Sequence, residues 1–228
     1  MSGPARRATL ALAALVLAAL AVAWAAGWLE ALERVLEARR TRAARQAVVA
    51  EIFAPVFESP EFQELARGRS DAEQQALLFE LARDGLVRLP DELLLERLAL
   101  LRDVAARADR RTCAMVLVGG SPGAAGDLVA ALEPEPLRRW LVLSREAVLA
   151  ALRDDPPRPL PPDEAERARA ALLEALGPED AARFEAALEA LDRLSQEEAC
   201  ALARATLEAA NRLPPEERRR VARLVASG

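Results

Sequence analysis

The stretch DELLLERLALLRDV, residues 91–104, decides the fold class of this 228-residue chain. Its apolar side chains at Leu94, Leu98 and Leu101 recur three or four positions apart, which is the spacing of one face of an α-helix. Asp91 opens the stretch, where a short polar side chain favours the beginning of a helix. The remaining composition agrees, because Ala, Leu, Glu and Arg are strong helix formers and aromatic residues make up only 4% of the chain. We therefore predict an all-α fold.

Capping residues and glycines mark the helices that precede this stretch. Ser59 and the Pro-Glu pair after it predict a helix start, and Gly68 predicts its end. Ser70 or Asp71 predicts the next start. We expect that helix to end at Gly85, because glycine commonly terminates helices.

Residues 154–162, DDPPRPLPP, form a proline-rich connector that cannot be helical, since each proline lacks a backbone N–H and fixes its φ angle. A helix over 136–152 is expected to precede it. The connector fits a PxxP ligand for a partner domain or a stiff spacer, and we expect the spacer because it is the commoner use. The connector divides the soluble region into a helical region over 30–153 and a C-terminal helical bundle over 163–228.

Within the C-terminal bundle, we expect a helix over 163–177 and another over 178 to about 194. Ser195 and Glu198 have the spacing of a capping box, in which each side chain binds the backbone N–H of the other residue. Pro214 and the residues after it predict a short terminal helix. Short loops join these elements, as in an antiparallel bundle.

An uncharged run of 22 residues, 8–29, lies near the start of the chain. As a helix it would be about 33 Å long, which matches the roughly 30 Å hydrocarbon core of a bilayer. Trp24 and Trp28 lie near its end, where an interfacial aromatic belt is expected. The run is therefore predicted to be a transmembrane helix.

Two interpretations of this run remain open. A cleaved signal peptide has a basic start, an apolar centre and small residues such as Ala23 and Ala25 before the cleavage site. An uncleaved signal anchor has a longer apolar run, and here apolar residues continue at helical spacing through Leu32 and Leu36. We predict the anchor.

The head of the chain, residues 1–7, carries Arg6 and Arg7, which favour a cytoplasmic N-terminus. Five arginines lie within 20 residues of the other end of the apolar run, and a plain count would favour the opposite orientation. We choose the cytoplasmic N-terminus because a short basic head is the ordinary layout of a signal anchor. This orientation predicts a single-pass protein of a bacterial inner membrane, with the lipid bilayer as one partner and the soluble region in the periplasm.

The charge balance excludes one class of partner. All 31 basic residues are arginine, which a GC-rich genome explains, and acidic residues are interleaved with them to a net charge of −5. A nucleic-acid-binding surface is normally a basic stripe. We therefore predict no nucleic-acid partner.

Residues 119–123 match G-x-S-x-G, the pattern of the nucleophile turn in serine hydrolases. The chain contains no His to act as the general base for Ser121, and Pro122 lacks the N–H that would stabilise an oxyanion. The same glycine-rich stretch has no Lys for a phosphate-binding loop. We expect a turn between helices there, with 114–118 helical, and no catalytic residue.

Without His, and with two Cys 87 positions apart, the sequence shows no metal-ligand spacing, and we expect neither a metal nor a cofactor. If the region is exported, Cys113 and Cys200 are candidates for a disulfide. Closing a loop of that length would stabilise the fold by about 4–5 kcal/mol. The alternative is two buried, unpaired cysteines.

These observations predict a membrane-anchored, non-catalytic helical protein that acts by contact with a protein partner, as an adaptor, scaffold or assembly factor. The alternative is a periplasmic helical protein released by signal-peptide cleavage, such as a carrier of an apolar ligand. N-terminal sequencing separates the two, because a mature chain beginning near Ala26 would exclude the anchor.

Overall fold

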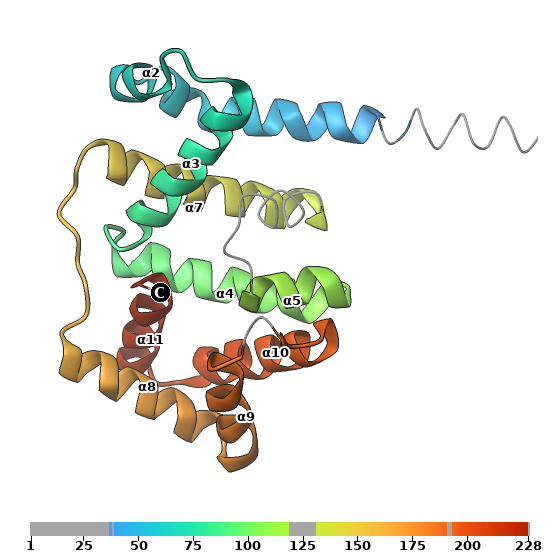
Figure 1. The fold of residues 1–228 in the computed structure, drawn as a ribbon, viewed down its shortest axis with the longest axis vertical. Coiled ribbons are helices and arrows are strands. Elements are labelled where there is room, and N and C mark those ends of the chain that lie inside the picture. Colours follow the sequence, from blue (N-terminus) through green and yellow to red (C-terminus); the bar gives the residue numbers. More distant parts are fainter. Residues whose placement is uncertain (1–36, 38, 119–130, 191–192, 228) are drawn as a thin grey trace, which may run out of the picture. The chain divides into compact units, whose positions relative to one another are not determined.

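The computed structural model in Figure 1 describes residues 37, 39–118, 131–190 and 193–227, and in these ranges it contains helices and no strand. The all-α prediction is confirmed for this part of the chain. Residues 1–51 and 52–228 form separate units. The predicted transmembrane run 8–29 lies outside the described residues, and none of the described helices is long and apolar enough to cross a membrane.

Residues 39–57 form the first described helix. The labelled helices that follow are α2 (Pro60–Ala66), α3 (Asp71–Leu86), α4 (Asp91–Arg107), α5 (Arg110–Val118), α7 (Pro134–Leu152), α8 (Pro162–Leu176), α9 (Pro178–Leu188), α10 (Gln196–Arg212) and α11 (Pro215–Ser227).

The three serines predicted to cap helices, Ser59, Ser70 and Ser195, do so, whereas the N-cap of α4 is Pro90 and no side chain caps that helix. Ser195 precedes α10, where its hydroxyl accepts from the N–H of Glu198 at 3.2 Å and the Glu198 carboxylate accepts from the N–H of Ser195 at 2.9 Å. Ser70 and Glu73 form the same reciprocal capping box at α3. Hydrogen bonds from Ser195 hold the pKa of Glu198 below its ordinary value of 4.5, because they stabilise the carboxylate form.

This lowered pKa predicts acid-dependent stability at the start of α10. Because the folded-state pKa of Glu198 is depressed, its contribution is present above pH 4.5 and is lost as the pH falls through the folded-state value. In Glu198→Gln the amide oxygen still accepts from Ser195 but does not titrate in this range. We expect the melting temperature of the wild type to fall relative to Glu198→Gln between about pH 6 and about pH 3. In a Ser195→Ala background this difference should shrink; an unchanged difference would contradict the assignment to the capping box.

Helix α4 lies at the centre of the helix packing. It contacts α5 and α7, which follow it before the connector, and also α10 and α11 from the C-terminal part. Leu94, Leu98 and Leu101 are buried, as the periodicity predicted, and Leu100 is completely buried as well. A helix that is covered from more than one side buries residues outside a single apolar stripe.

The two halves on either side of the connector share one hydrophobic core. Its buried members come from α4, α5 and α7 before the connector and from α8, α10 and α11 after it. The most extensive of these interfaces is between α5 and α10, and α4 packs on both α10 and α11. The connector is therefore not what holds the C-terminal helices to the rest of this unit.

Several helix boundaries differ from the sequence prediction. Gly85 does not end α3, which continues to Leu86. Helix α7 begins at Pro134, two residues earlier than expected, because a proline is well tolerated in the first turn. Helix α9 ends at Leu188, six residues earlier than expected, at a point where the sequence offers no Gly or Pro signal. Gly177 separates α8 from α9 as predicted and has a positive φ of 79°.

Candidate interaction surface

A cleft of about 460 Å³ lies where the connector passes the beginnings of α4, α8 and α11. We call it the charged cleft, because four basic and three acidic side chains line it together with Pro159, Leu160 and Pro161 of the connector. These charged residues are Asp91, Arg158, Glu164, Glu216, Arg219, Arg220 and Arg223.

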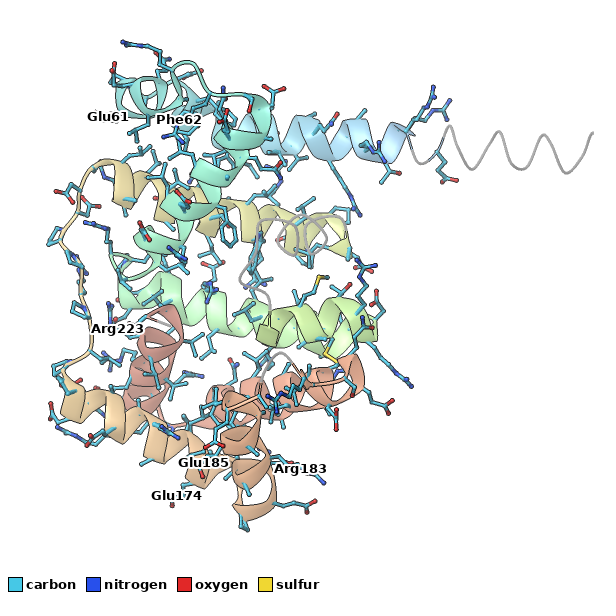
Figure 2. All side chains as sticks on the ribbon, in the orientation of Figure 1. Glu61, Phe62, Glu174, Arg183, Glu185 and Arg223 are labelled. Carbon is cyan, nitrogen blue, oxygen red and sulfur yellow. A yellow bond between two sulfur atoms is a disulfide. The ribbon has the colours of Figure 1, made fainter. Side chains whose placement is uncertain are left out.

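Arg223 is the buried member of the charged cleft, with only 9% of its surface exposed. Its Nε donates to the Asp91 carboxylate at 3.0 Å, and a second guanidinium nitrogen, Nη2, binds the same carboxylate. It also donates to the carbonyl of Arg158 at 2.8 Å and to that of Leu89 at 3.3 Å. One side chain of α11, Arg223, therefore joins the start of α4 to the connector (Arg223 is labelled in Figure 2).

Removing this guanidinium is expected to destabilise the fold. Arg223→Met leaves two carbonyls and the partly exposed Asp91 carboxylate without their donor, which should cost about 2–4 kcal/mol in the free energy of unfolding. Arg219→Met on the same helix is the matched control, because Arg219 pairs with Glu216 at 2.6 Å in an exposed position. It should cost under about 1 kcal/mol. Urea denaturation of the full chain measures both, and equal losses would contradict the role of Arg223.

Arg219 and Arg220 of the charged cleft are more exposed than Arg223. Arg219 pairs with Glu216, and Arg220 lies 2.8 Å from Glu217 and 3.6 Å from Glu164. The side chains of Arg219 and Glu216 are 43% and 67% exposed, and pairs of this kind contribute little and exchange partners easily. Arg219 and Glu216 of the cleft are therefore free to re-pair with a neighbouring surface.

The connector is fastened to the turn between α3 and α4. The N–H of Arg158 donates to the carbonyl of Val87 at 2.8 Å. Arg88 lies 3.0 Å from the Asp154 carboxylate and also donates to the carbonyl of Asp155. The side chain of Arg158 is exposed, and no described residue pairs with its guanidinium. The connector therefore presents a free cation from a fixed backbone.

Cys113 and Cys200 are joined by a disulfide, so the sequence prediction of this bridge is confirmed. Their Cα atoms are 5.0 Å apart, and both residues are buried, at 0% and 3% exposure. The bridge links α5, which precedes the connector in the sequence, to α10, which follows it. It reinforces the interface that already packs these two helices together.

Two further titratable groups have shifted pKa values for structural reasons. Hydrogen bonds from the N–H and hydroxyl of Thr112, at 3.0 and 3.1 Å, lower the pKa of Asp109 at the start of α5. Burial lowers the pKa of Arg97 to about 10, and its guanidinium carbon lies 5.9 Å from the ring centroid of Trp140. Neither group lines the charged cleft.

Residues 119–123, which match the G-x-S-x-G pattern and include Ser121, lie outside the described residues. Residues 114–118 are helical, as expected, and form the end of α5. Within the described ranges no group of three or more His, Cys, Asp or Glu residues could hold a metal ion.

No sequence pattern predicted the Arg223–Asp91 pair. Asp91 was expected only as a helix start, and Arg223 lies 132 positions away in a helix with several other arginines. No local pattern relates two residues at that separation, so only the folded arrangement of α4 and α11 brings them together.

Comparisons of this chain with models of protein families, with curated proteins and with solved structures found no match.

Proposed function

We propose that this chain is a single-pass protein of a bacterial inner membrane, anchored by residues 8–29, whose helical domain acts by protein–protein contact in the periplasm. In this proposal the domain is an adaptor, scaffold or assembly factor and performs no catalysis itself. The observation that carries it is the disulfide between Cys113 and Cys200.

The disulfide supports a periplasmic location on chemical grounds. Disulfides persist in oxidising compartments such as the periplasm, whereas cytosolic thiols are kept reduced. Both cysteines are buried at the interface of α5 and α10, where a bridge serves structure. An oxidising compartment for this domain agrees with a cytoplasmic N-terminal head and one membrane crossing.

The charged cleft supports a contact function. Its ion pairs, the exposed Arg219–Glu216 and the half-buried Arg220–Glu164, place both signs of charge on one surface beside the connector. Complementary charges of this kind contribute more to specificity and association rate than to raw affinity. A partner protein with a matching pattern could exchange these pairs at small cost.

Thiol labelling tests the location. In freshly isolated and denatured full-length chain, a maleimide should label neither cysteine before reduction and both after it. Free thiols before reduction would overturn the periplasmic assignment. N-terminal sequencing of the same sample tests the anchor, because a mature chain beginning near Ala26 would replace it with a released protein.

Affinity isolation from detergent-solubilised membranes tests the contact function. We expect the wild type to retain a specific partner and Arg219→Glu with Arg220→Glu to lose most of it. Arg183→Glu on α9 is the matched control, because Arg183 also pairs with exposed carboxylates but lies outside the charged cleft. Recovery of no specific partner by the wild type, or the same loss in the control, would count against the proposal.

A further inference from the structure

The connector is an extended, proline-rich segment, and its last residue before α8 has dihedral angles close to those of polyproline II. Pro161 has φ −54° and ψ 146°, near the polyproline II values of about −75° and 145°. Residues 155–161 are neither helix nor strand, and five prolines stand among the seven residues 156–162. Proline favours this extended conformation because its ring fixes φ.

The connector is also exposed and fixed at the same time. The prolines at 156, 157, 159 and 161 are exposed, whereas Leu160 is half-buried. Arg158 anchors the segment through its backbone, since its N–H donates to Val87 and its carbonyl accepts from Arg223. The side chain of Arg158 remains exposed. The connector thus presents exposed prolines and one free cation from a backbone that two hydrogen bonds hold in place.

A spacer role does not account for the exposed prolines and the fixed backbone of the connector. The helices on either side of the connector share one hydrophobic core, and the disulfide between Cys113 and Cys200 links them covalently. Joining them requires only enough chain to span from α7 to α8, which Figure 1 shows as an extended path. Rigidity and exposed prolines serve recognition, because a preformed polyproline II segment has little conformational entropy left to lose on binding.

We propose that residues 156–161 form a recognition segment for a partner protein domain with an aromatic-lined groove and a carboxylate beside it. Aromatic rings of such a groove pack against proline rings in the polyproline II conformation. The carboxylate of the partner would pair with the guanidinium of Arg158, which forms no ion pair with any described residue. This inference rests on the proposed contact function and identifies the surface and the chemistry of the partner.

The test uses two known readers of this conformation, an isotope-labelled SH3 domain and an isotope-labelled WW domain, titrated with the full chain in detergent. We expect chemical-shift changes in the aromatic groove of at least one reader, with a dissociation constant below about 1 mM. Pro157→Ala with Pro159→Ala should weaken this binding by about tenfold or more. Pro215→Ala, an exposed proline outside the connector, is the matched control and should leave it unchanged.

Arg158→Glu keeps every proline and the backbone anchor, so it tests the charge separately from the conformation. We expect weaker binding with an unchanged melting temperature. Binding by neither reader at about 1 mM, or binding that the connector variants leave unaltered, would overturn the inference. Thiol labelling would still decide the location independently, and affinity isolation with the Arg219 and Arg220 variants would test the contact function in a chain whose connector sequence is unaltered.

Discussion

Replacing Cys113 and Cys200 together by alanine is expected to lower the free energy of unfolding by about 4–5 kcal/mol. The bridge spans 87 positions, and a cross-link that closes so long a loop removes much of the conformational freedom of the unfolded chain. For a domain of this size the loss corresponds to a fall in melting temperature of about 10–20 °C. Thermal unfolding of the full chain in detergent measures it.

Reductant supplies the control for this prediction. Dithiothreitol should lower the melting temperature of the wild type toward that of the double alanine variant, and it should leave the variant unaffected. If the reduced wild type melted at the same temperature as the oxidised protein, the bridge would not contribute to stability. Because α5 and α10 also pack extensively, we expect the reduced chain to remain folded at low temperature.

The sequence alone predicted the helices that begin with a chemical signal. Ser70 and Ser195 stand in capping boxes, and a box needs only residues three apart along the chain. The apolar periodicity of α4 likewise reports on one helix at a time, so the burial of Leu94 and Leu98 was predictable. These features depend only on residues close together in the chain, so they can be predicted from the sequence.

Features that depend on packing between distant helices were not predictable in the same way. Leu100 lies outside the predicted apolar stripe and is buried because α4 has neighbours on more than one side. Arg223 joins Asp91 and the connector only because α11 packs on α4. The disulfide was foreseen as a candidate because the chain contains only two cysteines, so pairing required no knowledge of the fold.

The prediction at Gly85 placed the end of α3 one residue too early, and the packing at this glycine leads to a large expected effect. From the sequence, Gly85 is expected to end the helix. In the structure it is the last residue but one of α3, which packs against α7 (Figure 1). A Cβ atom at this position would lie 1.8 Å from the carbonyl oxygen of Ala147 and 2.4 Å from its carbonyl carbon. Both are backbone atoms, so the clash cannot be relieved by rotating a side chain.

Gly85→Ala is therefore expected to lower the free energy of unfolding by about 3 kcal/mol or more, at the upper end of overpacking effects, because α3 and α7 must separate. Helix propensity alone predicts the opposite, since alanine is favoured over glycine inside a helix by about 1 kcal/mol. Gly68→Ala is the matched control: its φ is 75°, and nothing lies within 4 Å of an added Cβ atom. The control should lose only about 1–2 kcal/mol, the strain of a left-handed residue. Urea denaturation measures the free energy of unfolding of both variants and so decides between packing and helix propensity. A Gly85→Ala protein as stable as the wild type would show that α3 and α7 do not approach each other this closely.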